Sequence, residues 1–481
     1  MTTRLINVVA RKVRRGIFGY APCRYLSDEI LKDIFLFTDE FTRDEWDQRL
    51  ETEQEIIYLG LHLSHVSPQW RRVALKMPTL WAGLRICQSE PPMASPFTLP
   101  RSTRRFLRHF LQYSSPLLIY LTLSAENHLI LTCLPTQRVR SLVIYGTAEA
   151  IYDASQRCTT QFSALQDLII QISPPPPPPI GHLGHMIPIV GDNFFDFFPS
   201  MTWLTLRNVY SFPHFWRIPA LRRLTWTMDP QCELDSFSFS FYTLTDIRYL
   251  ELDVPNLKGS PFGIATRMED VVFKNAGSTI MNALNRAIPP NLTSLTITSF
   301  ENITLKLLGF LDGWRGERIQ TLSLSLIDIT SIIWYQVLRR VPNVKTLELG
   351  LTPTVHVPDP FTELMDALAV HQNDVILVPR LSELCLAGDV LSGIVRVVDF
   401  LRVRALEHKL AVTQEIDQVE TNELAVTQEI DQVKTLVLPT GYFTQIPEWL
   451  AWELRNWVVV KADAALNHLV EPVALVYHDF Y

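Results

Sequence analysis

The stretch IQTLSLSLIDITSIIWYQVLRRVPNVKTLEL, residues 319–349, decides the fold. It begins and ends with one six-position pattern, apolar-x-x-apolar-x-apolar, whose middle residues are Leu322 and Leu347. Alternating apolar residues of this kind are typical of a strand with one buried face. The segment between the two patterns predicts a helical or irregular return, so the unit reads strand, return, strand.

The same pattern recurs along most of the chain. Its middle residue falls at Leu121, Leu142, Leu168, Leu204, Leu224, Leu250, Val271, Leu295, Leu322, Leu347, Leu384 and Leu436. Most of the gaps lie within or next to the ~20–29 residues of a leucine-rich repeat. The chain therefore resembles leucine-rich-repeat proteins. The expected fold class is α/β, with a small N-terminal helical module followed by an irregular solenoid, or horseshoe.

The strand units are expected to stack side by side, because a single unit cannot bury its own apolar edge and needs a neighbouring unit to cover it. The Asn or Cys that usually follows the strand in such repeats is absent here, which predicts irregular turns. Residues that alternate with the buried positions should point to the concave face. As substrate-binding candidates on that face we name Trp203, Arg207, Arg223, Tyr249, Glu251 and Asp270.

Two short segments near the N-terminus form the helical module. YLSDEILKDIFLF, residues 25–37, carries an apolar helical stripe with Ser27 or Asp28 as its cap. LSHVSPQWRRVALKMPTLW, residues 63–81, supplies a second helix that Pro78 ends. A module of only a few helices buries little apolar area, so these helices should pack against a partner or against the rest of the chain.

These residues resemble an F-box of the variant common in fungal F-box-like proteins, with Ser27 in place of the family's proline. The matching positions are Leu26, Glu29, Ile30, Ile34, Phe35, Trp70 and Trp81. The resemblance implies docking on a Skp-family adaptor and, through it, on a cullin-RING (SCF-type) ubiquitin ligase. The repeats would bind a protein substrate for ubiquitin-dependent degradation. Adaptor binding is expected at Leu26, Ile30, Ile34 and Phe35.

The predicted layout has four parts. A basic tail covers 1–21, and an amphipathic transit peptide is its alternative. The F-box-like module covers 22–86, the solenoid 101–460, and a C-terminal cap 461–481. Insertions are expected at 174–199, with six consecutive prolines, at 353–379, and at 390–432, where LAVTQEIDQV occurs twice.

Composition limits the possible partners. A net charge of -7 gives no broad basic face for nucleic acid, and six dispersed cysteines indicate reduced thiols. No apolar run is long enough to span a membrane, so a cytoplasmic or nuclear protein is expected.

Catalytic patterns are missing from the sequence, which has no Gly-rich phosphate loop, HExxH or GxSxG. We therefore expect no enzyme activity, no cofactor and no metal. Two alternatives stay open: a leucine-rich-repeat scaffold with a degenerate F-box and no ligase role, and an enzyme of an unrecognised type on the concave face.

Overall fold

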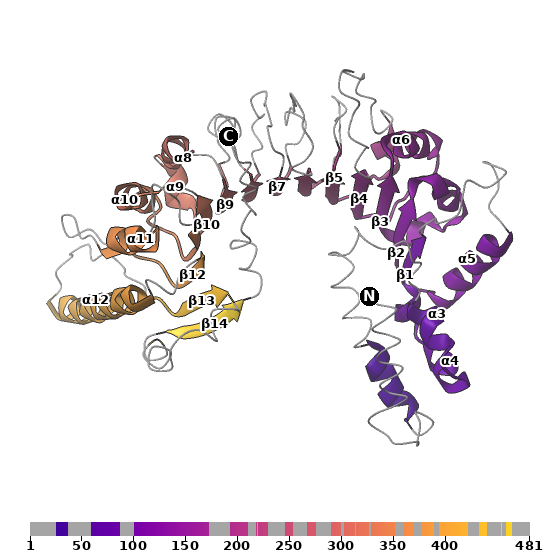
Figure 1. Ribbon diagram of the computed structural model, residues 1–481, viewed down its shortest axis with the longest axis horizontal. Helices are drawn as coiled ribbons and strands as arrows, with labels where there is room; N and C mark the ends of the chain where they lie inside the picture. Colours follow the sequence, from indigo (N-terminus) through magenta and orange to yellow (C-terminus); the bar gives the residue numbers. More distant parts are fainter. Residues whose placement is uncertain are drawn as a thin grey trace, which may run out of the picture. The chain divides into compact units, whose positions relative to one another are not determined.

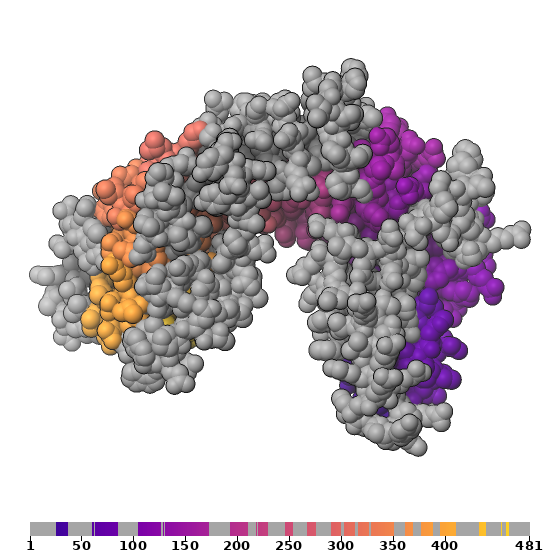
Figure 2. All heavy atoms as spheres, viewed as in Figure 1, coloured from indigo at the N-terminus to yellow at the C-terminus, as the bar shows by residue number. Residues whose placement is uncertain are grey.

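A computed structural model describes most of the predicted F-box-like module, 22–86, and most of the predicted solenoid, 101–460. The described residues are 26–36, 59–86, 101–172, 193–209, 218, 220–228, 246–253, 267–275, 290–299, 303–312, 314–326, 329–351, 360–369, 377–388, 394–421, 432–439, 454 and 458–463. The others are grey in Figures 1 and 2. The chain divides into two compact units, Met1–Trp203 and Leu204–Tyr481.

Among the described residues, fourteen strands form a single open sheet, in sequence order from β1 to β14. The paired strands run parallel, for example β10 (Thr321–Leu326) beside β11 (Thr346–Leu351). An α/β fold is therefore confirmed. The leucine-rich-repeat assignment and the horseshoe curvature stay predictions.

All twelve predicted pattern positions lie on strands β2 to β13. Leu322 pairs with Leu295 on one side and Leu347 on the other, and the same register continues to Leu384 and Leu436. All twelve side chains are 0–1% exposed. A fully buried leucine stabilises a fold by about 1.5–3 kcal/mol, so this column is a main part of the core.

The first unit begins with the head, which comprises helical residues 28–36, α3 (Leu59–Ser64), α4 (Pro68–Ala74) and η2 (Pro78–Trp81). The head leads into the sheet without a break, because β1 (Gly83–Ile86) pairs with β2 (Ile119–Ser124). The other elements of this unit are α5 (Arg101–Tyr113), η3 (Ala125–Cys133), η4 (Thr136–Arg138), β3 (Val139–Gly146), α6 (Ala148–Arg157), β4 (Asp167–Ile172) and η5 (Phe194–Phe197).

One register irregularity occurs between β2 and β3, where Ile119 and Tyr120 pair with Val139 and Ser141. The pattern predicts Leu118 as a core residue, but Leu118 is 40% exposed, and Ile119, which pairs with Val139, is 0% exposed. The register shifts between Ile119 and Tyr120, so Ile119 takes the core place. A bulge of this kind adds one residue to one strand and restores the alternation beyond it.

The second unit begins at Leu204, within β5 (Trp203–Arg207). Its strands are β6 (Arg223–Thr227), β7 (Tyr249–Asp253), β8 (Asp270–Lys274), β9 (Ser294–Thr298), β10, β11, β12 (Glu383–Gly388), β13 (Thr435–Pro439) and β14 (Val459–Asp463). Its helices are α8 (Thr304–Leu311), α9 (Trp314–Arg318), α10 (Ser331–Arg339), α11 (Pro360–Ala369) and α12 (Ile394–Thr421). Helices α8, α10, α11 and α12 follow one another along one side of the later strands (Figure 1).

Several predicted features lie outside the described residues. These are the basic tail, the six prolines, most of the second LAVTQEIDQV copy and nearly all of the C-terminal cap. The first copy lies in α12, the helix within the expected insertion 390–432. Insertion 353–379 contains α11, and insertion 174–199 ends in η5, where Phe194 and Phe195 are buried. Strand β14 crosses the predicted boundary at 460.

Candidate functional site

Ser27 caps the first helix of the head. Its hydroxyl oxygen accepts a hydrogen bond from the backbone N–H of Ile30 at 3.3 Å, and its carbonyl accepts one from Leu31 at 3.1 Å. Serine is among the residues that best satisfy the free N–H groups at a helix start. Ser27 therefore starts the helix by hydrogen bonding.

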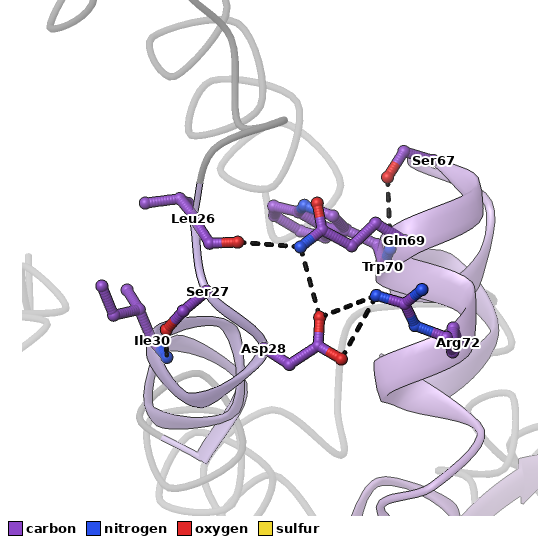
Figure 3. A network of polar contacts seen from close by, with 8 residues as sticks. All are labelled: Leu26, Ser27, Asp28, Ile30, Ser67, Gln69, Trp70 and Arg72. Carbon is purple, nitrogen blue, oxygen red and sulfur yellow. Dashed lines mark hydrogen bonds and ion pairs between the residues drawn. The ribbon is translucent and has the colours of Figure 1, made fainter.

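Asp28 joins the first helix to α4 (Figure 3). Its carboxylate accepts hydrogen bonds from Gln69 Nε2 at 3.3 Å and from Arg72 Nη2 at 3.0 Å, and Gln69 Nε2 also donates to the Leu26 carbonyl at 2.8 Å. The bonds from Gln69 and Arg72 hold the pKa of Asp28 below its ordinary value. This network fixes the angle between the two helices at the start of the head.

The buried side of the first helix packs on α4. Leu31 and Phe35 are fully buried, and the Phe35 ring meets Trp70 edge-on with centroids 5.0 Å apart. Trp81 closes the head, because its indole Nε1 donates to the Ala74 carbonyl at 2.9 Å and its ring lies 5.1 Å from Tyr113 of α5. The side chain of Phe35 is thus a core residue of the head and is not available to a partner.

The other side of the first helix presents aliphatic side chains. Ile30 is 48% exposed and Ile34 is 38% exposed, while Leu26 is half-buried beside them in sequence. Ile30 and Ile34 are four residues apart and lie on one helical stripe, and Leu26 stands just before the Ser27 cap at the start of that helix. We call Leu26, Ile30 and Ile34 the head stripe. Three of the four predicted adaptor-binding residues thus lie on one accessible surface.

A polar cluster occupies the outward face of β6, β7 and β8. The Arg223 guanidinium carbon lies 4.0 Å above the centre of the Tyr249 ring, and the Tyr249 hydroxyl donates to Glu251 Oε2 at 2.9 Å. Lys274 Nζ donates to Glu251 Oε1 at 2.8 Å. The Thr225 hydroxyl lies 3.4 Å from Glu251 Oε2. We call these five residues the Glu251 cluster.

Electrostatics in the Glu251 cluster favour a charged carboxylate beside a neutral phenol. Burial opposes the charge on Glu251, but the hydrogen bond and charge of Lys274, together with Tyr249, bring the net pKa of Glu251 below its ordinary value. Burial and the Glu251 carboxylate raise the pKa of Tyr249 to about 12. The cluster is held together by charge-assisted hydrogen bonds, which fix an aromatic and an arginine side chain at one place on the surface.

Next to this cluster, the Asp253 carboxylate accepts a hydrogen bond from Asn275 Nδ2 at 2.6 Å. Burial is the main cause that raises the pKa of Asp253. Asn275 has a φ of 54°, the left-handed region in which asparagine is tolerated better than most residues. Asn275 therefore turns the chain at the end of β8 and also ties β8 to β7.

Among the six predicted substrate-binding residues, the structure brings Arg223, Tyr249 and Glu251 into direct contact. Asp270 pairs with Tyr249 in the sheet register. Trp203 and Arg207 alternate with the buried Leu204 and Leu206 on β5, as expected, and Trp203 belongs to the first unit. Sequence reasoning missed the roles of Gln69, Arg72 and Asn275.

Within the described residues, no group of three or more His, Cys, Asp or Glu side chains could hold a metal ion. No described helix has both the length and the apolar character needed to cross a membrane. No protein-family model matches the sequence, and a search of curated proteins finds no match.

Proposed function

We propose that this chain is the substrate-recognition subunit of a cullin-RING ubiquitin ligase of the SCF type. In this proposal the head is an F-box that docks on a Skp-family adaptor, and the stacked strands are an irregular leucine-rich-repeat solenoid that holds a protein substrate. The chain itself carries out no chemistry, because the ligase's other subunits would transfer the ubiquitin.

The head stripe is the observation that carries this proposal. The first helix is anchored on its inner side by the fully buried Leu31 and Phe35, whereas Ile30 and Ile34 on its other side keep 48% and 38% of their surface exposed. An exposed aliphatic row on a fixed helix is the usual way in which a helix enters a partner's groove. Ser27 supports the same reading, since the helix keeps its start without the family's proline.

Co-purification with the adaptor tests the docking half of the proposal. We expect the full chain to retain a Skp-family adaptor and the double variant Ile30→Asp with Ile34→Asp to lose it. Leu305→Asp with Ile332→Asp is the matched control, because Leu305 is 84% exposed and Ile332 is 70% exposed, and both lie in the second unit. An adaptor that is never retained would leave the scaffold function as the better account.

For the substrate half, the Glu251 cluster is the proposed contact surface. Its stacked Arg223 and Tyr249 are the residue types that dominate binding energy in protein interfaces. Arg223→Glu combined with Tyr249→Ala should abolish substrate capture and leave adaptor retention unchanged. Capture at the wild-type level by this variant would refute the assignment of the surface.

A further inference from the structure

A polar groove lies at the edge of the sheet where strands β8 to β12 begin. It has a volume of about 490 Å³ and is lined by Glu269, Asn291, Thr293, Glu317, Arg318, Gln320, Asn343, Lys345 and Arg380. This volume falls within the ~300–1,000 Å³ typical of ligand pockets. All nine residues belong to the second unit, and none was predicted as a site residue.

The repeat itself builds two parallel rows of side chains in this groove. Glu269, Thr293, Gln320 and Lys345 each stand directly before a strand, and each backbone N–H in this row after Glu269 donates to the carbonyl of the previous member at 2.8–2.9 Å. A second row stands three residues before the first residues of β9, β10, β11 and β12, and consists of Asn291, Arg318, Asn343 and Arg380. Neighbouring members of a row are thus about 4.8 Å apart at the backbone, the spacing between adjacent strands.

Hydrogen-bond donors dominate the second row. Its side chains are two amides and two guanidinium groups, and it contains no carboxylate. Lys345, in the first row, is exposed and adds an ammonium group to the lining. Three cations against the two carboxylates Glu269 and Glu317 give the lining a net charge of +1 (3 − 2), on a protein whose net charge is -7. Glu269 also has its own cation, since its carboxylate lies 3.8 Å from Arg248.

We propose that this groove binds an extended acidic peptide segment of a partner protein. Carboxylate side chains would meet the guanidinium groups of Arg318 and Arg380 and the ammonium group of Lys345. The Arg318 guanidinium is held in place by a bond to the Pro290 carbonyl. Within the groove, Asn343 Nδ2 donates to the Glu317 carbonyl at 2.6 Å and the Thr293 hydroxyl to the Glu269 carbonyl at 3.3 Å, so these two side chains stiffen the groove wall. Arg318 and Arg380 stand two strands apart, roughly 10 Å at the sheet, which equals three residues of an extended peptide. Glu317 and Glu269 disfavour the dense charge of a polyphosphate. This inference does not depend on the proposed ligase function.

The test uses the full-length protein and a fluorescent peptide with glutamate at every third position. Fluorescence anisotropy should show binding, and the same peptide with glutamine in place of glutamate should bind at least about tenfold more weakly, because charge-assisted hydrogen bonds are lost. The double variant Lys345→Gln with Arg380→Gln should bind the glutamate peptide more weakly than the wild type does, by a similar factor. The matched control is Lys409→Gln with Arg402→Gln, which removes the same charge from exposed residues of α12 outside the groove.

A charge swap separates binding from folding. The Lys345→Glu variant should bind the glutamate peptide more weakly than the wild type does, and the corresponding lysine peptide more tightly. A misfolded variant could not gain affinity in this way. Equal losses in the groove variant and its control would overturn the proposal. Displacement of the peptide by inorganic tripolyphosphate at a lower concentration than by unlabelled peptide would overturn the choice of ligand.

Discussion

Replacing Glu251 by glutamine should destabilise the protein, although the two side chains have nearly the same shape. The Glu251 carboxylate accepts hydrogen bonds from Lys274 at 2.8 Å and from Tyr249 at 2.9 Å. Its net pKa is lowered, so the attractions outweigh the cost of burying the charge. Folding therefore favours the charged form, which the glutamine variant cannot adopt.

The expected loss is about 1 kcal/mol at neutral pH. A hydrogen bond to a charged group contributes roughly 1.5–3 kcal/mol and a neutral one about 1 kcal/mol, so the amide retains part of each interaction. Lys274 is 42% exposed, and solvent screening reduces its ion pair with Glu251 to the ~0.2–1 kcal/mol of surface pairs. Urea unfolding at matched pH measures the difference from the shift of the transition midpoint.

The pH dependence of stability tests whether the charge on Glu251 is the cause of this loss. Because folding lowers the pKa of Glu251 from its ordinary value of 4.5, its contribution is complete above that value and is lost as the pH falls through the folded-state pKa. Wild type and Glu251→Gln should then converge in stability. The control is Glu348→Gln, at the equivalent place on β11. A variant as stable as the wild type at neutral pH, or a difference unchanged by acid, would refute the account.

Three further changes test separate parts of the structure. Tyr249 should titrate at about 12, measured as the difference in ultraviolet absorbance between the wild type and Tyr249→Phe. Its pKa should fall toward the ordinary value of 10 in Glu251→Gln. The stability that the neutral phenol contributes is present below its unfolded-state pKa and is lost as the pH rises through its folded-state pKa. Ser27→Ala and Ser67→Ala should each cost the head about 1 kcal/mol as lost helix caps, measured by hydrogen exchange of their helices, and unchanged exchange would contradict the capping roles. Trp226→Phe should cost about 2 kcal/mol in urea unfolding, because Trp226 is fully buried and its indole N–H donates to the Val209 carbonyl at 3.2 Å; a loss under half of that would argue against tight packing there.

The sheet could be predicted well because one physical requirement repeats along the chain. Each strand must bury the same column of side chains, so the spacing within LTSLTI or VKTLEL shows both the strand and its register. Strands β1 and β14 were missed although they follow the same pattern, as Trp81-x-x-Leu84-x-Ile86 and Trp457-x-x-Val460-x-Ala462. In both, a tryptophan takes the first apolar place, and Trp81 was assigned to the head instead.

Contacts between distant residues explain what the sequence did not reveal. Gln69 and Arg72 reach Asp28 across 41 and 44 residues, and no local pattern specifies such a pair. Phe35 fits the family's motif as well as Ile34 does, yet only packing on Trp70 shows that Phe35 is buried. The Glu251 cluster could be predicted in part, because alternation gives the direction of each side chain but not which neighbours bond to one another.

Hydrogen exchange of the full-length protein, alone and with a purified Skp-family adaptor, tests the central claim most directly. The adaptor should slow exchange in peptides that cover residues 26–36, because docking on the head stripe would stabilise and shield that helix. The strands from β6 to β13 should exchange at the same rate in both samples. Unchanged exchange over 26–36 at a saturating adaptor concentration, or protection confined to those strands, would contradict the proposed function.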